Sequence, residues 1–279
     1  MILTEGPSDR AALTNFFTEM YAMIDEDIEV FFPVMTEESI SRDEGVEKNY
    51  NGDVTSRNGV TPDNILPMLL KMFIHPEFKK HPAYEYPASV VEVIHIVDID
   101  GVFTADDRII EGSPGNSKML PYYDDENGII IVKDLDEIIS RNEAKRRNLK
   151  KLVDTKKLRI TVAKGRHDEK EKPYKVYYFS SNLDHVLFGN ANNEGFNKLP
   201  YARSFGNTFY DEPLKLASYF LNHPCAVDAK DYKESWEKLY GVNKSLKPLT
   251  NINILVRDLL KRAKVQENSL PDNDIYITV

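Results

Sequence analysis

The chain has 279 residues, of which 41% are hydrophobic, 10% aromatic and 29% charged, and its formal net charge is −9. This composition is typical of a soluble globular protein, long enough for one large domain or two smaller ones, with no apolar run near the roughly 18 residues of a membrane span. A signal-peptide pattern is lacking and Cys225 is the single cysteine, so we expect a cytoplasmic protein without a disulfide, a cysteine-based zinc site or membrane association.

The first residues predict a very short strand followed by a helix. Residues 1–3 are apolar and Gly6 ends the predicted strand. The segment PSD at 7–9 supplies residue types that are typical of a helix start. Apolar residues then recur at helical spacing over 13–24, which predicts an amphipathic helix.

The next segments predict an alternation of strands and helices. A strand is expected at 28–35, a loop or mobile insertion at the polar, turn-rich residues 36–60, and a helix over 61–74. The strongest strand pattern is VVEVIHIVDIDG at 90–101, because its near-continuous apolar run is typical of the centre of a parallel sheet covered on both faces. The alternating order predicts an α/β fold with a parallel sheet.

The remainder predicts further strands and then a mostly helical region. Strands are expected at 128–134, 158–164 and 175–182, a charged amphipathic helix at 135–153, and helices at 212–223, 230–241 and 251–264. Residues 190–210 predict a boundary or a loop at the edge of a site. We therefore predict a catalytic α/β domain over 1–200 and a helical region over 201–279, the latter serving dimerisation or docking.

The charge is unevenly distributed along the chain. Residues 141–175 contain 14 Lys/Arg and 5 Asp/Glu, a net charge of +9, which leaves −18 for all other residues. A basic tract on an acidic body is able to hold a nucleic-acid phosphate backbone against one face. A solvated helix followed by a polar loop would have the same composition, so the charge alone does not decide between the two.

Four carboxylates are expected to meet at one edge of the predicted sheet. Glu5 closes the first strand, Asp98 and Asp100 close the central one, and Asp9 lies about one helical turn beyond Glu5. Ligands of open α/β sheets bind at the carboxyl ends of the strands. Two carboxylates about 4 Å apart repel by roughly 4 kcal/mol at an effective dielectric constant near 20, so such a cluster favours a cation.

An oxygen-rich site of this kind suits Mg²⁺ or Mn²⁺. Two such ions, about 3.5–4 Å apart, activate water and stabilise the leaving oxygen of a phosphodiester. The chemistry that the carboxylates indicate is phosphoryl transfer or hydrolysis.

The segment ILTEGPSD, followed by a strand that ends IVDIDG, resembles the Toprim domain of topoisomerases, bacterial primases and OLD-family nucleases. The E-G-x-x-D form of the first motif is most similar to OLD-like and small stand-alone Toprim nucleases. The resemblance implies that Glu5, Asp9, Asp98 and Asp100 are metal ligands or act through the metals, with Asp184 as a further acidic ligand. It also implies a lysine that assists the transition state, and a role in antiviral (phage) defence beside an ABC-type ATPase partner.

Two other interpretations remain open. The segment DIDGVFTADDRI also resembles the first motif of haloacid-dehalogenase-type phosphatases, in which Asp98 would be the nucleophile and Asp100 the general acid/base. Thr104 would follow as in that motif and Ser180 would imitate the second motif, but a strand-ending Gly-Asp-x-x-x-Asp is missing. The third interpretation is a non-catalytic Toprim-like scaffold, for which any ATP-driven step comes from another chain because no P-loop is present.

Structural roles are the alternative for several of these residues. Asp9 is at a position that is typical of a helix cap, and His95 within the apolar strand is expected to be a packed core histidine. Asn182 and His185 suit helix caps, and Trp236 suits core packing of the C-terminal helices. Taken together, the residues predict a Mg²⁺-dependent Toprim-like nuclease that cleaves DNA or RNA.

Overall fold

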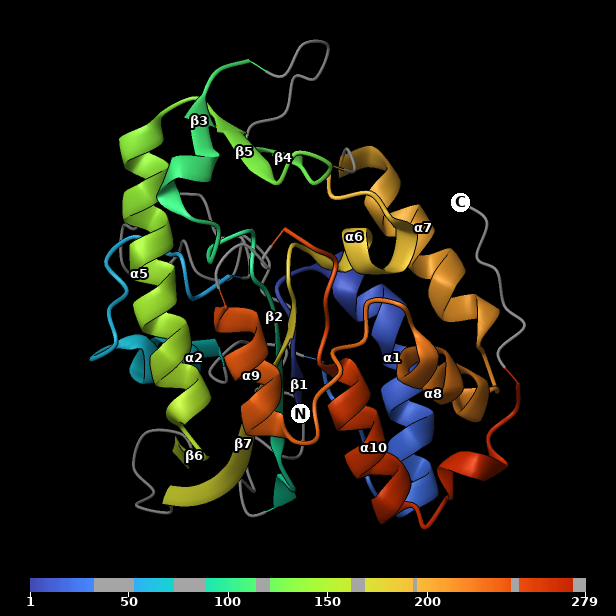
Figure 1. Ribbon diagram of the computed structural model, residues 1–279. Coiled ribbons are helices and arrows are strands. Elements are labelled where there is room, and N and C mark those ends of the chain that lie inside the picture. Colours follow the sequence, from blue (N-terminus) through green and yellow to red (C-terminus); the bar gives the residue numbers. More distant parts are fainter. Residues whose placement is uncertain are drawn as a thin grey trace. The chain divides into compact units, whose positions relative to one another are not determined.

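The computed structural model describes residues 1–32, 53–72, 89–113, 121–161, 169–192, 195–241 and 246–272, and these form a mixed α/β fold (Figure 1). The helices of the described residues are α1 (Pro7–Ile24), α2 (Ile65–Met72), α5 (Leu135–Asp154), α6 (Leu183–Phe188), α7 (Gly195–Thr208), α8 (Pro213–Asn222), α9 (Tyr232–Tyr240) and α10 (Ile252–Arg262). None of these helices is long and apolar enough to cross a membrane.

The strands form two sheets. One has the order β1 (Ile2–Leu3), β2 (Val93–Asp98), β7 (Glu169–Phe179), β6 (Lys157–Thr161); the other has the order β3 (Ile109–Glu111), β5 (Ile129–Val132), β4 (Tyr122–Asp124). β1 and β2 pair in parallel, as do β3 and β5, whereas β6 pairs with β7 and β4 with β5 in antiparallel fashion. The predicted α/β class is confirmed, with parallel pairs in both sheets, but the sheets are mixed and not wholly parallel.

The chain divides into two compact units, each made of several segments. Unit 1 comprises Met1–Pro7, Phe31–Val97 and Glu143–Val176, and unit 2 comprises Ser8–Val30, Asp98–Asn142 and Tyr177–Val279. The division therefore falls inside β2, β7 and α5, each of which is one continuous element. The domain boundary expected at residue 200 stays a prediction.

In unit 1, β2 is the buried strand that its apolar sequence predicted. Val93 to Val97 are all buried, and β1 pairs beside this strand in a register that places Ile2 against Ile94 and Leu3 against His95. The strand expected at 28–35 is not formed over residues 28–32, and 33–35 lie outside the described residues. The Phe31 carbonyl nevertheless accepts a backbone hydrogen bond from the Ile2 amide.

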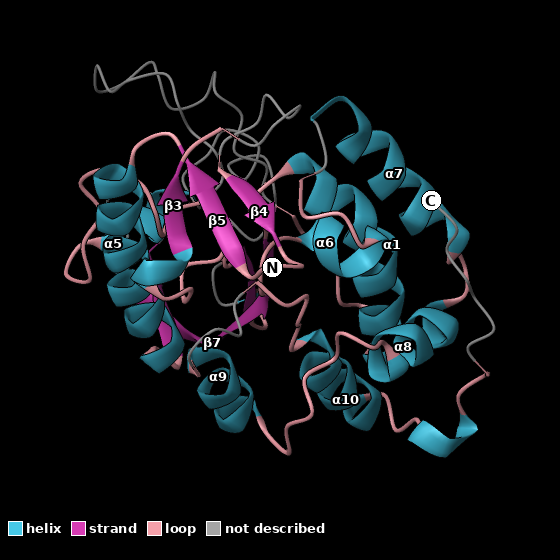
Figure 2. Ribbon diagram, turned by 45° about the horizontal axis from the view of Figure 1, so that its top comes forward, coloured by secondary structure: helices cyan, strands magenta, loops and turns pink. Residues whose placement is uncertain are grey.

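Unit 2 contains most of the helices and the sheet of β3, β5 and β4, whose strands lie side by side in Figure 2. Helices α8, α9 and α10 confirm the helical pattern predicted after residue 211. The stretch 190–210 was expected to be a boundary or a loop at the edge of a site, but helix α7 occupies most of its length. The composition of this stretch and its internal Pro200 are not typical of a helix, so the sequence does not predict one. Aromatic packing explains why the helix forms: the Phe205 ring contacts that of Phe220 on α8.

A glycine allows α7 to approach α1 closely. A Cβ atom built on Gly206 would lie 2.5 Å from the carbonyl oxygen of Ala11, a distance that real Cβ atoms essentially never show. The Asn15 side chain, also on α1, donates a 3.2 Å hydrogen bond to the Gly206 carbonyl. Because the clashing atom belongs to the backbone, a larger residue at 206 forces the two helices apart.

We therefore predict that Gly206→Ala destabilises the protein, by about 1–3 kcal/mol as for other overpacked sites. Urea unfolding followed by circular dichroism measures the effect. Gly112→Ala is the matched control, because a Cβ atom at Gly112 would meet only ordinary contact at 3.5 Å, with Ile131. Equal stability of the two variants would contradict the close approach of α7 and α1.

Candidate metal centre

Glu5 lies just beyond the end of β1, in unit 1, as the sequence predicted. β1 and β2 are parallel, and Leu3 pairs with His95. Glu5 comes two residues after Leu3, so it lies near the carboxyl ends of both strands. The Glu5 side chain is 13% exposed. A carboxylate is thus held near the end of two neighbouring parallel strands, where α/β proteins bind ligands.

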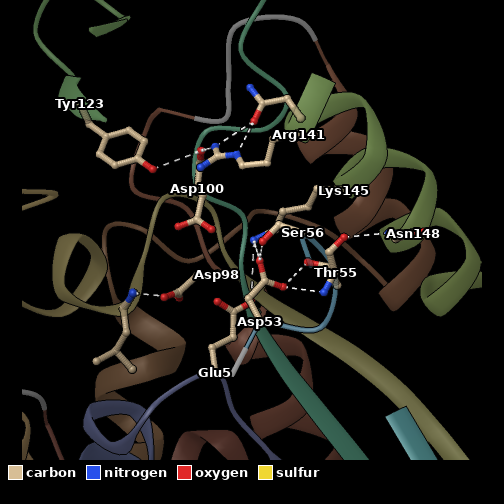
Figure 3. A network of polar contacts seen from close by, with 12 residues as sticks. Glu5, Asp53, Thr55, Ser56, Asp98, Asp100, Tyr123, Arg141, Lys145 and Asn148 are labelled. Carbon is tan, nitrogen blue, oxygen red and sulfur yellow. Dashed lines mark hydrogen bonds and ion pairs between the residues drawn. The ribbon is translucent and has the colours of Figure 1, made fainter. Parts of the chain in front are cut away.

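A buried lysine and a second carboxylate lie beside Glu5 in unit 1. The Nζ atom of Lys145, on α5, lies 2.7 Å from Oδ2 of Asp53 and 3.9 Å from Oε1 of Glu5 (Figure 3). The Lys145 side chain is 0% exposed and that of Asp53 is 7% exposed. The Lys145 ammonium group and the Asp53 carboxylate pair closely because both are buried, and either charge without its partner would strongly destabilise the fold.

The segment that carries Asp53 is fixed by further hydrogen bonds. The Thr55 amide donates to Asp53 Oδ1 at 2.7 Å, and the hydroxyls of Thr55 and Ser56 donate to the same carboxylate. From α5, the Asn148 side chain donates to the carbonyls of Thr55 and Val60, at 2.8 and 3.2 Å. Residues 53–60, expected to belong to a loop or mobile insertion, form a loop that is hydrogen-bonded to Asn148 of α5. Residues 36–52 lie outside the described part.

These contacts set the charge states at the end of the sheet. Burial by itself raises the pKa of Asp53, but the charge of Lys145 and the hydrogen bonds from Lys145, Ser56 and Thr55 outweigh it and bring this pKa to about 2. Burial lowers the pKa of His95 to about 4, with Asp53 opposing this shift and Lys145 adding to it. His95 is therefore a neutral core histidine, as predicted, and its Nδ1 lies 2.8 Å from the Tyr174 hydroxyl.

In unit 2, Asp98 and Asp100 are oriented by different means. Asp98 is the last residue of β2, and its Oδ1 accepts a 3.1 Å hydrogen bond from the Leu183 amide at the start of α6. Asp100 lies in a turn with φ of 53°, and its amide donates to the Ser181 carbonyl at 2.8 Å. β2 ends at Asp98, so Asp100, which was expected to close the strand together with Asp98, lies in the turn beyond it.

Asp9 and Asp184 each lie in the first turn of a helix. Asp9 is buried in α1, and Asp184 is buried in α6, with Oδ2 3.4 Å from Nζ of Lys198. The α6 cap is Asn182, whose side chain accepts a hydrogen bond from the His185 amide, which confirms the capping role expected for Asn182. Asp184 thus has a lysine as its charge partner, and its role as a ligand stays a prediction.

Sequence reasoning missed Asp53 and the specific lysine, Lys145. The two residues are 92 positions apart, and Asp53 stands in a polar stretch that has the composition of a loop. The helical period of 135–153 places position 145 on the same stripe as 149 and 152, where Leu149 and Leu152 are buried. A lysine on the apolar face of a predicted helix was the one available signal of a buried cation.

Comparison of the chain with protein-family models, with curated proteins and with solved structures finds no match.

We predict that Lys145→Met destabilises the protein by about 3–5 kcal/mol, because it leaves the buried Asp53 carboxylate without its cation. Denaturant unfolding measures the loss. Lys150→Met is the matched control, since Lys150 lies on the exposed face of the same helix and should change stability by less than about 0.5 kcal/mol. A Lys145→Met protein as stable as this control would contradict the proposed importance of the buried pair.

The depressed pKa of Asp53 also predicts a pH dependence. A carboxyl group whose pKa falls from 3.8 to about 2 on folding stabilises the folded state above pH 3.8, and this contribution is lost as the pH falls toward 2. It amounts to about 2 kcal/mol. We therefore expect the stability of the wild type to fall more steeply between pH 5 and 2 than that of Asp53→Asn. Parallel pH profiles for the two proteins would show that Asp53 does not titrate in this way.

Proposed function

We propose that the chain is a divalent-metal-dependent nuclease of the Toprim type, and that Glu5, Asp53 and Asp100 hold a metal ion. One observation carries this proposal: each residue offers a carboxylate oxygen, and these three oxygens lie within 4.8 Å of one another (Figure 3). Among the described residues this is the one group of three or more acidic, histidine or cysteine ligands that is so closely spaced.

The chemistry of the three carboxylates fits a small divalent cation. Carboxylate oxygens are the ligands that Mg²⁺ and Mn²⁺ prefer, and Mg²⁺ binds them at about 2.0–2.1 Å. Three carboxylates and the ammonium group of Lys145 sum to a charge of −2, which one divalent ion balances. The same proposal includes a second ion, with Asp9 and Asp98 as its ligands and Asp184 as a further acidic ligand.

Each protein group has a defined task in this proposal. When bound, a pair of such ions supplies an activated water and stabilises the leaving oxygen of a phosphodiester. Lys145 orients Asp53 and helps to keep it ionised: burial raises the Asp53 pKa, but the charge of Lys145 and the hydrogen bonds from Lys145, Ser56 and Thr55 lower it to about 2. The 53° φ of Asp100 and the hydrogen bond from its amide to Ser181 hold that residue in one backbone conformation. Preorganised ligands need little rearrangement when substrate binds.

The basic tract supplies the proposed nucleic-acid contact. Its exposed cations in the described residues of α5 and β6, and between these elements, are Arg147, Lys150, Lys151, Lys156, Lys157 and Arg159. Lys157 and Arg159 also lie 3.5 and 3.8 Å from Glu171, which reduces the charge that they offer. Cations in this number bind a phosphate backbone without reading its sequence, so either DNA or RNA fits.

The resemblance of ILTEGPSD and IVDIDG to OLD-like Toprim nucleases supports the cellular role that we propose. This role is antiviral defence in the cytoplasm, with an ABC-type ATPase as the partner protein. The helices of residues 201–279 are the proposed surface for a homodimer or for that partner.

The phosphatase interpretation has less support from the surroundings of its proposed residues. Ser180, which would imitate the second phosphatase motif, is fully buried. Its hydroxyl donates to the Lys247 carbonyl and accepts a 2.7 Å hydrogen bond from the Leu249 amide. These contacts hold the 247–249 segment and leave the hydroxyl poorly placed for a phosphate group.

The proposed nuclease activity predicts metal-dependent cleavage. Purified protein should cleave plasmid, single-stranded DNA or transfer RNA with Mg²⁺ or Mn²⁺ and should not do so with EDTA. Glu5→Gln and Asp100→Asn should each reduce the rate at least about 100-fold, as expected for loss of a group that stabilises charge in the transition state. Asp107→Asn is the matched control, since Asp107 is an exposed carboxylate in the following turn and should have no effect.

Cleavage that survives both Glu5→Gln and Asp100→Asn would contradict the proposed site. Hydrolysis of small phosphate monoesters through a phosphorylated Asp98, without cleavage of nucleic acid, would favour the phosphatase. Inactivity until a partner ATPase is added would favour the effector or scaffold role.

A further inference from the structure

A single arginine of α5 is held beside Asp100 in unit 2. The Nε and Nη2 atoms of Arg141 donate to the Asn142 side-chain oxygen, at 3.2 and 2.8 Å, and Nη2 also donates to the Asp100 carbonyl at 3.4 Å (Figure 3). Both partners are neutral oxygens. The guanidinium plane is thus oriented by its own neighbour and directed at the residue that we propose as a metal ligand.

The turn to which Arg141 is anchored has little freedom to move. Gly101 follows with φ of 68°, and a Cβ atom there would lie 2.7 Å from Cδ1 of Ile130, on β5. The Tyr123 hydroxyl, from β4, donates to the same Asp100 carbonyl at 3.4 Å. Side chains of Tyr123 and Arg141 therefore both donate to the Asp100 carbonyl, and the turn is packed against the β4 and β5 strands. These contacts hold the Arg141 guanidinium at a fixed distance from Asp100.

The guanidinium retains donors that protein groups do not use. Within the described residues, the Nη1 atom of Arg141 donates no hydrogen bond, and no carboxylate forms an ion pair with this arginine. Arg141 is only partly exposed, whereas Arg147, six residues later, is 63% exposed and paired with Glu143. A partly buried arginine without an anion is unusual, because buried charges are normally paired.

Lys145 does not fill this role, although it lies one helical turn further along the same face of α5. Its ammonium group is completely buried and lies 2.7 Å from Asp53. Of these two cations, Lys145 is therefore paired with a protein carboxylate, and Arg141 keeps donors for an anion that the described part of the chain does not supply.

We propose that Arg141 binds a non-bridging oxygen of the phosphate group that is cleaved, and thereby aligns this phosphate with the metal ligand Asp100. The inference rests on the nuclease function proposed above and assigns to it a substrate-binding residue that the sequence motifs do not indicate. A guanidinium suits the task because its planar fork presents two N–H donors to phosphate oxygens, whereas an ammonium acts as a point charge.

The test compares Arg141→Gln and Arg141→Lys with Arg108→Gln as the control, because Arg108 is an exposed arginine outside the basic tract of residues 141–175. Cleavage of a 5′-labelled single-stranded oligonucleotide gives kcat and KM, and titration with Mn²⁺ alone reports on the carboxylate site. We expect Arg141→Gln to lower kcat/KM by roughly 10- to 100-fold, the kinetic equivalent of losing a hydrogen bond to a charged group, while Mn²⁺ affinity changes less than about threefold. Arg108→Gln should change neither quantity by more than about threefold.

The Arg141→Lys variant distinguishes loss of the phosphate contact from loss of the folded structure. It keeps the positive charge and a donor for the Asp100 carbonyl, so it should unfold at the wild-type temperature and still lose most of kcat/KM, because the fork is gone. Equal cleavage by Arg141→Gln and Arg108→Gln would overturn the inference while leaving the nuclease proposal intact. Loss of Mn²⁺ binding in step with cleavage would also overturn it, by showing that Arg141 only supports the Asp100 turn. A wild type that neither binds Mn²⁺ nor cleaves would refute the proposed function itself.

Discussion

The ammonium group of Lys145 lies 2.7 Å from the Asp53 carboxylate, with both side chains almost completely removed from solvent. This buried pair connects α5 to the segment that begins at residue 53, and it lies 3.9 Å from Glu5 at the end of β1. A buried carboxylate would ordinarily take up a proton, but Lys145 and the hydroxyls of Thr55 and Ser56 keep Asp53 ionised. The ionised state of the buried Asp53 carboxylate therefore depends chiefly on one lysine.

The candidate ligands come from segments that are distant in sequence because parallel strands end at the same edge of a sheet. Glu5 follows β1, Asp98 ends β2, and Asp100 follows in a turn whose left-handed conformation is continued by Gly101. Two cations of α5 lie in this region: Lys145 orients Asp53, and Arg141, one turn earlier, is the proposed contact for substrate. In the proposed nuclease the bound metal balances the carboxylates, and Arg141 adds a positive charge that attracts the phosphate.

Periodic features of the fold were predictable from the sequence and long-range pairs were not. The continuous apolar run of β2 and the helical spacing of α5 and α10 are local patterns, and the structure confirms them. Helix α7 was missed because its packing on α1 depends on a glycine contact with a residue almost 200 positions away. Asp53 and Lys145 were missed for the same reason, since the ion pair joins positions 92 apart and nothing within either segment indicates the other. The motifs that carry Glu5, Asp98 and Asp100 were visible in the sequence because each lies at the end of a strand or just beyond it.

The most direct test of the proposed metal site is anomalous diffraction from crystals grown with Mn²⁺. The account predicts an anomalous peak about 2.0–2.4 Å from carboxylate oxygens of Glu5, Asp53 and Asp100. It predicts that this peak disappears in Asp100→Asn crystals, while the hydrogen bond between Lys145 and Asp53 persists. Well-ordered carboxylates without a peak at millimolar Mn²⁺, or a peak bound elsewhere in the chain, would contradict it.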